Sequence, residues 1–192
     1  MSTLPPPASA PRQQPLLDSP IIARQAADLL RTPQAIRQLD AAESAAVVAQ
    51  MQLVYFPAGS VLLREGDDHH SNYMLLILEG WVSVDTGAAD GSDVVEVAAL
   101  GPGSIIGEMA LLDGAPRSAT CVATSAVQAA GLSRIGLERL IDDHPKVAAK
   151  LMMALATRIS DRLRSLGKQL QMYAQITATM QQDLDNLRKL TR

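Results

Sequence analysis

The chain has 192 residues, of which 47% are hydrophobic and only five are aromatic, so it is long enough to bury one largely aliphatic core. Its formal net charge is −3, but residues 145–192 hold nine Lys and Arg against three Asp, so charge is unevenly distributed. The single cysteine, Cys121, excludes an intrachain disulfide and a four-cysteine metal site.

The sequence carries no sign of a membrane segment, a signal peptide or a metal site. It lacks a run of about 18 apolar residues, and its N-terminus is neither basic nor followed by a hydrophobic segment. The three histidines, His69, His70 and His144, lack partners at metal-ligand spacing. We therefore expect a cytoplasmic protein without a bound metal, in which His69 and His70 belong to a polar loop.

The N-terminal quarter of the chain is predicted to be a tail followed by helices. Residues 1–20 hold six of the eleven prolines and have little to bury, so we expect a disordered tail. Residues 21–52 have a helical pattern of apolar residues, with an interruption at Pro33. Ser19 and Pro20 fit the cap and first-turn positions of a helix start.

From Leu53 onward, apolar residues occur in short runs between glycine-containing turns, which is typical of β-strands. Such closely spaced strands favour a sandwich or barrel, with a hairpin tip at Asp90-Gly91. Trp81 follows a glycine turn, and we expect it to pack on the barrel surface rather than stack on a ligand. Residues 133–142 are predicted to form a short helix capped by Ser133. The strands are expected at 60–63, 73–78, 81–84, 94–99, 120–124 and 126–132.

The most informative segment is residues 107–123, which read GEMALLDGAPRSATCVA. Glu108 opens a run that suits a single helical turn, and residues 113–116 then interrupt it. The free N–H groups at a helix start and the guanidinium of Arg117 both favour binding of a phosphate. A phosphate would repel a neighbouring carboxylate, so Glu108 is better suited to accept hydrogen bonds from sugar hydroxyls. A phosphate and a ribose held side by side indicate a nucleotide site.

This segment resembles the phosphate-binding cassette of the cyclic nucleotide-binding domain family, in which glycine and glutamate precede a short spacer and then Pro-Arg-Ser-Ala-Thr. FPAGSVLLREGD (56–67) and LEGWVSV (78–84) resemble the early strands and glycine turns of the same domain. The resemblance covers about residues 53–164. It implies an α+β fold: N-terminal helices, an antiparallel β-barrel or jelly roll at 53–144, and a long C-terminal helix.

The resemblance also implies which residues bind the ligand, cAMP or cGMP. Arg117 would hold the cyclic phosphate and Glu108 the ribose 2′-hydroxyl. Backbone or hydroxyl contacts would come from Gly107, Met109 and Ser118. No metal takes part in this arrangement.

The base of the nucleotide is left open by the sequence. Arg162 and Leu163 stand where catabolite activator-type members of the family have two small hydroxyl residues, so the adenine contacts do not carry over. Arg162 is a candidate to stack on a purine or to donate to guanine, and the alternative is that it points to solvent. A larger cyclic dinucleotide is an alternative ligand.

Residues 145–192 are predicted to form one long helix, because Pro145 suits its first turn and no proline follows. Apolar residues recur there at alternating spacings of four and three, which is a heptad pattern typical of a coiled coil. Positions a are Leu163, Leu170, Thr177 and Leu184, and positions d are Ile159, Leu166, Tyr173, Met180 and Leu187. The resemblance implies a homodimer through 145–192; a helix folded back on its own domain is the alternative.

Activator-type members of the family follow this helix with a helix-turn-helix domain, whereas this chain ends at Arg192. We therefore expect no direct DNA binding, and we interpret the basic residues at 158, 162, 164 and 168 as a solvated coiled-coil face or a wall of the nucleotide pocket. The leading hypothesis is a stand-alone cyclic nucleotide sensor that dimerises and regulates an effector protein. The alternative is a structural adaptor or coiled-coil scaffold that has lost its ligand.

The sequence argues against an enzyme. Ser118 and Cys121 have no histidine base nearby in sequence, so neither is set up as a nucleophile. Glu108 lacks a second acid positioned for acid–base work. We therefore expect a cyclic nucleotide to be bound and not hydrolysed.

Overall fold

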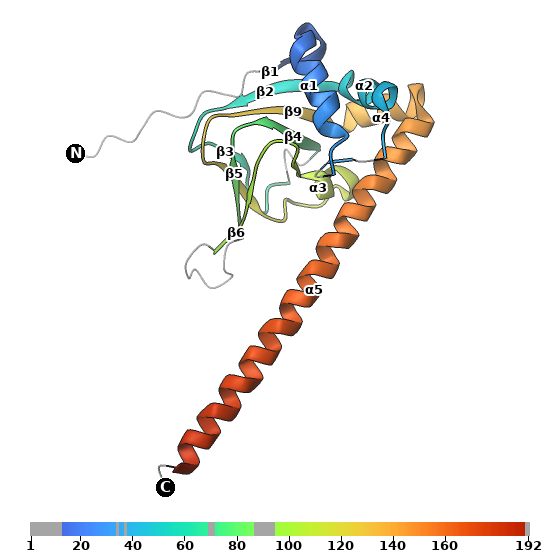
Figure 1. Cartoon of the computed structure of the whole chain (residues 1–192). Coiled ribbons are helices and arrows are strands. Elements are labelled where there is room, and N and C mark those ends of the chain that lie inside the picture. Colours follow the sequence, from blue (N-terminus) through green and yellow to red (C-terminus); the bar gives the residue numbers. More distant parts are fainter. Residues whose placement is uncertain (1–12, 34, 37, 69–71, 87–94, 191–192) are drawn as a thin grey trace, which may run out of the picture. The chain divides into compact units, whose positions relative to one another are not determined.

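The computed structural model describes residues 13–33, 35–36, 38–68, 72–86 and 95–190 (Figure 1). The chain divides into two units, Met1–Ala154 and Leu155–Arg192. The first unit combines two antiparallel sheets with helices, which confirms the predicted α+β fold. The second unit continues a helix that begins in the first.

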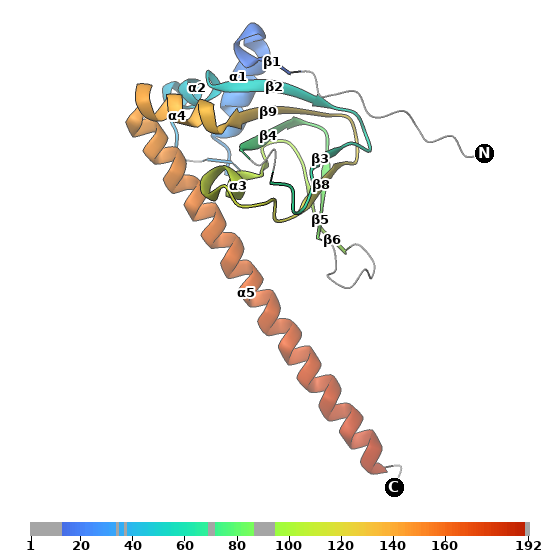
Figure 2. The same ribbon diagram turned by 180° about the vertical axis from the view of Figure 1, so that it is seen from behind.

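The first sheet has five strands, in the order β1-β2-β9-β4-β7. Its strands are β1 (Gln13–Pro15), β2 (Met51–Phe56), β9 (Val127–Ser133), β4 (Tyr73–Glu79) and β7 (Ile105–Ile106). The second sheet has four strands, in the order β3-β8-β5-β6, and Figure 2 shows it from behind. Its strands are β3 (Val61–Leu63), β8 (Thr120–Ala123), β5 (Val82–Thr86) and β6 (Val95–Leu100). Within the described ranges, every predicted strand is present with small differences at its ends.

The main core lies between the two sheets. Leu75 and Ile77 of β4 contribute to it from the first sheet, and Val82 and Val84 of β5 from the second. The other face of the first sheet is also covered, since α1 (Pro20–Leu30) packs against β4 and the Gln25 amide donates to the Leu78 carbonyl at 3.3 Å. Burial on both faces explains why β4 reads as a continuous apolar run from residue 74 to 78.

Beside α1, three further α-helices lie entirely within the described part of the first unit: α2 (Ala41–Val48), α3 (Glu108–Asp113) and α4 (Arg134–Asp143). Asp40 and Glu43 form a reciprocal capping box at the start of α2. Ser133 caps α4 as predicted, because its hydroxyl accepts a hydrogen bond from the Gly136 N–H at 3.1 Å. Trp81 is half exposed, and its ring packs over Gly101, which agrees with the predicted surface packing.

Two predictions for the N-terminal region need correction. The predicted disordered tail of residues 1–20 is wrong for residues 13–20, because β1 pairs with β2 and a short 3-10 helix, η1 (Leu16–Asp18), follows it. The physical reason is Leu16, whose side chain is fully buried and ties this segment to the core. The helical pattern extended to residue 52, whereas β2 already begins at Met51.

The remaining predictions outside the sheets and the long helix concern a helix cap and three segments that the structure does not describe. Pro20 is the first residue of α1 as predicted, but the Ser19 side chain makes no capping hydrogen bond. Residues 1–12, the His69-His70 loop and the Asp90-Gly91 hairpin tip lie outside the described residues.

The long C-terminal helix is confirmed as α5 (Pro145–Leu190), a continuous helix of 46 residues. At 1.5 Å per residue it extends about 70 Å. Five apolar side chains at positions a and d of the predicted heptad are exposed within the described part of α5: Leu163 (69%), Leu166, Leu170 (70%), Tyr173 and Met180. The coiled-coil partner of this seam stays a prediction. In the part of the chain that is described, none of the helices combines the length and apolar character needed to cross a membrane.

Candidate functional site

The predicted cassette begins with a sharp change of direction between β7 and α3. Gly107 has a φ of 76°, in the left-handed region that favours glycine, and serves as the N-cap of α3. No side chain caps this helix start. The helix ends at Gly114, with a φ of 70°, and Arg134 donates a hydrogen bond to the Leu111 carbonyl at 2.9 Å. The predicted single helical turn and its interruption are therefore both present.

Arg117 is the central residue of the site, and only 5% of it is exposed. Its guanidinium Nη1 donates a hydrogen bond to the Gly107 carbonyl at 2.9 Å. Its backbone is also fixed, because the Arg117 N–H donates to the Asp67 carbonyl at 3.1 Å and the Gly66 N–H donates to the Arg117 carbonyl at 2.9 Å. A buried, permanently charged donor is thus held between the two ends of the cassette and the loop after β3.

Burial is the largest cause of the pKa shift of the Arg117 guanidinium. It lowers the pKa of the Arg117 guanidinium below its ordinary value, while the neighbouring Tyr73 and Asp67 oppose that change. A guanidinium stays protonated in proteins, so Arg117 remains a cation at neutral pH. A cation removed from water in this way interacts more strongly with an anion than an exposed one does.

A cavity of about 190 Å³ lies next to Arg117. Its wall consists of β3 and the loop that follows it, together with Tyr73 at the start of β4. Two cations, Arg64 and Arg117, and one acidic residue, Asp67, belong to this wall. The residues that line it are Val61, Leu62, Leu63, Arg64, Asp67, Tyr73 and Arg117.

Glu108, the first residue of α3, is 6% exposed. Among the described residues, none makes a hydrogen bond or an ion pair with the Glu108 carboxylate. The carboxylate oxygens can therefore accept hydrogen bonds from another molecule. This environment therefore suits a ligand that donates hydrogen bonds to Glu108, as sugar hydroxyls do.

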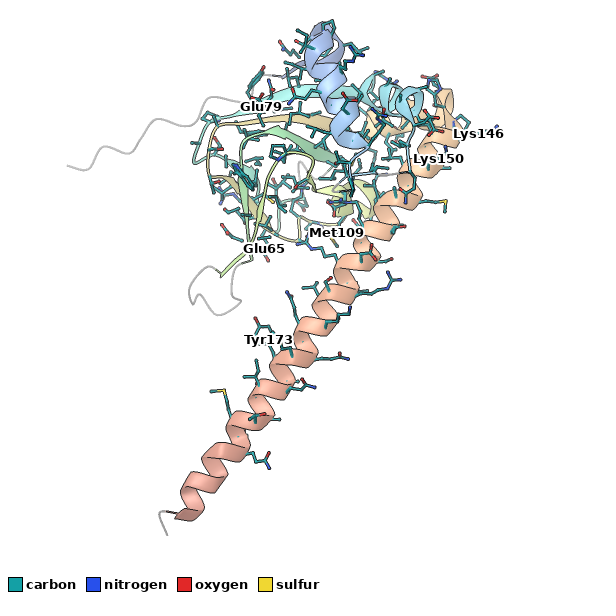
Figure 3. All side chains as sticks on the ribbon, viewed as in Figure 1. Glu65, Glu79, Met109, Lys146, Lys150 and Tyr173 are labelled. Carbon is teal, nitrogen blue, oxygen red and sulfur yellow. The ribbon has the colours of Figure 1, made fainter. Side chains whose placement is uncertain are left out.

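Met109 and Ser118 lie together on the outer side of the cassette. Both are exposed, and the Ser118 hydroxyl lies 3.8 Å from the Met109 sulfur. Met109 projects from α3 (Figure 3). Five of the six predicted site residues lie within residues 107–118; of these, Arg117 lines the cavity, and the Gly107 carbonyl accepts a hydrogen bond from it. The sixth, Arg162, is an exposed residue of α5 in the second unit.

Sequence reasoning missed Tyr73. Its ring centroid lies 4.5 Å from the Arg117 guanidinium carbon, a cation–π contact, and its hydroxyl donates to the Leu62 carbonyl at 3.1 Å. The available signal was weak: Tyr73 is one of five aromatics and immediately precedes the apolar run of β4. No group of three or more His, Cys, Asp or Glu residues suited to hold a metal occurs within the described ranges.

Residues 53–144 match the family model described as the cyclic nucleotide-binding domain. Over 115 residues the chain is 30% identical to the CRP-like cAMP-activated global transcriptional regulator of Mycobacterium tuberculosis. This match covers 60% of the chain and 50% of the regulator, so the chain spans about half the length of that relative.

Two solved structures resemble the chain at 32% sequence identity. One is a cyclic nucleotide-binding domain from Methylobacillus flagellatus, with a TM-score of 0.66; the match covers 74% of this chain and 79% of that one. The other is the N-terminal domain of a transcriptional regulator from Streptomyces coelicolor, with a TM-score of 0.62. That match covers 70% of this chain and 94% of the other.

Proposed function

Because the chain belongs to the cyclic nucleotide-binding domain family, we propose that residues 107–123 bind the phosphate and the ribose of cAMP or cGMP. The observation that carries this proposal is the buried Arg117 cation, which lines a cavity and is fixed to the Gly107 carbonyl. A singly charged cyclic phosphate suits one buried guanidinium, which offers a planar fork of N–H donors.

Glu108 completes the proposed recognition by accepting a hydrogen bond from the ribose 2′-hydroxyl. Its burial without a protein partner among the described residues supports this role. Gly107 contributes because only glycine leaves room for the Arg117 guanidinium beside its α-carbon. Met109 and Ser118 are proposed to contact the nucleotide from the edge of the cassette, and Arg162 is proposed to contact the base.

The first experiment measures cyclic nucleotide affinity by calorimetry for the wild type and for Arg117→Ala. Loss of the buried charge partner of the phosphate should weaken binding by roughly 2–5 kcal/mol. Arg139→Ala is the matched control, because Arg139 is an exposed residue of α4. Unchanged affinity in Arg117→Ala would contradict the assignment.

The role of Glu108 is tested with a modified ligand. Glu108→Ala should weaken cAMP binding, but it should have little effect on 2′-deoxy-cAMP, which lacks the hydroxyl that Glu108 is proposed to bind. An equal loss for both ligands would mean that Glu108 acts elsewhere.

The base and the competing functions are separated by a thermal-shift panel of cAMP, cGMP and cyclic dinucleotides. A ligand that binds only the folded state raises the melting temperature. Stabilisation by cAMP or cGMP supports the sensor, and stabilisation by a cyclic dinucleotide alone favours that alternative receptor. No response to any ligand would favour the structural adaptor.

We further propose that α5 mediates homodimer formation and passes the signal to a partner protein. The exposed apolar side chains of Leu163, Leu166 and Leu170 support this, because such a seam is normally covered. Leu170→Glu should yield monomers in analytical ultracentrifugation, whereas Lys168→Glu at heptad position f should not. A wild-type monomer at all accessible concentrations would exclude the dimer.

The proposed mechanism is a shift of equilibrium between helix positions, with residues 142–146 as the hinge. A ligand that makes better contacts in one position increases the population of that position. Direct DNA binding is not part of the proposal, because the basic residues of α5 fall in one stretch of a heptad helix that Asp161 interrupts. Salt-dependent binding to duplex DNA would overturn this part.

A further inference from the structure

Tyr73 is the one aromatic ring in the wall of the cavity, among the residues that line it. The Arg117 guanidinium carbon lies 4.5 Å from the centre of this ring. Neither the cassette nor the proposed ligand contacts account for a tyrosine at this place.

The ring is fixed at both ends. Tyr73 begins β4 of the first sheet, and its hydroxyl donates to the Leu62 carbonyl of β3, in the second sheet, at 3.1 Å. The side chain therefore connects the two sheets beside Arg117, and its plane is set by the backbone of both. A ring held in this way offers a rigid surface to the guanidinium.

The electrostatics of the pair suit a cation. Burial raises the pKa of the Tyr73 phenol, and the Arg117 cation opposes this change only in part. The phenol is therefore neutral at physiological pH. The face of a neutral aromatic ring carries negative potential and attracts a cation.

The ring packs against the face of the guanidinium, whereas a carboxylate partner would bind along its edge, where an incoming anion also binds. The Gly107 carbonyl orients Nη1 from one side and the ring fixes the plane. Together they preset the direction in which the fork of Arg117 points.

We propose that Tyr73 is a positioning residue for anion binding, which holds the Arg117 guanidinium in the orientation that receives the cyclic phosphate. The proposal rests on the proposed function of the cassette. It assigns no direct ligand contact to Tyr73, because the ring acts through Arg117. The ring supplies the surface that packs on the guanidinium, so phenylalanine should retain most of the effect, and loss of the hydroxyl bond to Leu62 should matter less than loss of the ring.

The first test compares affinities for cAMP and cGMP in three variants. Tyr73→Leu should weaken binding about tenfold, whereas Tyr73→Phe should stay within about threefold of the wild type. Tyr55→Leu is the matched control, because Tyr55 is exposed on β2 and hydrogen-bonds only Gln128 among the described residues. An equal loss in Tyr73→Leu and Tyr73→Phe would overturn the proposal.

The second test separates action through Arg117 from direct ligand contact. In an Arg117→Met background, Tyr73→Leu should cause no further loss of affinity, because the group that it positions is gone. A full tenfold loss in that background would show that Tyr73 touches the ligand itself, and the proposal would be wrong.

The third test needs no ligand, so it remains informative if the wild type binds no cyclic nucleotide and the proposed function fails. The side-chain N–H signal of Arg117 in the ligand-free protein should show a ring-current shift in the NMR spectrum of the wild type and of Tyr73→Phe. This shift should disappear in Tyr73→Leu. An unchanged signal in folded Tyr73→Leu would show that the ring does not hold the guanidinium.

Discussion

Gly107→Ala tests the geometry of the cassette most directly. A φ of 76° is costly for alanine, by about 1–2 kcal/mol. The added Cβ would also lie 2.6 Å from Arg117 Nη1, 3.1 Å from Leu63 Cδ1 and 3.2 Å from the Tyr73 carbonyl oxygen. The guanidinium must therefore move away from the Gly107 carbonyl, and a hydrogen bond to a charged group contributes about 1.5–3 kcal/mol. The total loss of unfolding free energy should be roughly 3–5 kcal/mol.

Gly59→Ala is the matched control for the backbone part of this loss. Gly59 has a φ of 79°, and a Cβ there would meet nothing within 4 Å. Its loss should therefore be only about 1–2 kcal/mol. The difference between the two variants reports the steric conflicts at Gly107, of which the one with Arg117 is the closest.

Urea unfolding of the ligand-free proteins measures both losses, and calorimetry measures cyclic nucleotide binding. Gly107→Ala should weaken binding as well as stability, whereas Gly59→Ala should affect stability alone. In an Arg117→Ala background, the difference between the two glycine variants should become smaller, and only the contacts with Leu63 and the Tyr73 carbonyl should remain. Equal losses in the wild-type background, or a difference of the same size without Arg117, would refute the reasoning.

Three further predictions concern other contacts. The folded-state pKa of Tyr73 is raised, so the native protein keeps this proton longer than the unfolded chain does, and stability should fall as the pH rises above about 10. This part of the fall should be absent in Tyr73→Phe, and an identical urea midpoint profile for both proteins would contradict it. The hydrogen bond from Lys150 holds the pKa of Glu43 below its ordinary value of 4.5, so the stabilisation is present above that pH and is lost as the pH falls below it. Glu43→Gln should flatten the acid limb of the urea midpoint profile, and an unaltered limb would count against the ion pair. In Gly101→Ala, the added Cβ would approach the Trp81 ring to 2.9 Å, so the ring should move outward into solvent. The fluorescence emission of this single tryptophan should then shift to longer wavelength. An unshifted emission spectrum would argue against the packing of Trp81 on Gly101.

The cassette was predictable from sequence because its structure is mostly local. Glycines at both ends of a short helical run set the bounds of α3, and their left-handed backbone is what the chain needs there. Burial of Glu108 and Arg117 then follows from their place between a buried strand and the strand β8.

The partner of Arg117 could not be predicted in the same way. Tyr73 reaches it from a different strand, and its position depends on how the two sheets pair and face each other. The prediction of disorder for the N-terminal tail was wrong for a related reason. Its proline content favours disorder, but one leucine, Leu16, finds a fully buried site that only the folded sheet provides.

The short strand β1 has a practical consequence for work with shortened versions of this protein. It covers the outer edge of β2, with Gln13 opposite Val54 and Pro15 opposite Gln52. A recombinant fragment that begins after residue 20 would leave that edge without its hydrogen-bonding partner and would empty the site of Leu16. Unpaired sheet edges recruit strands from other molecules, so such a fragment should aggregate even though every residue of the cassette is retained.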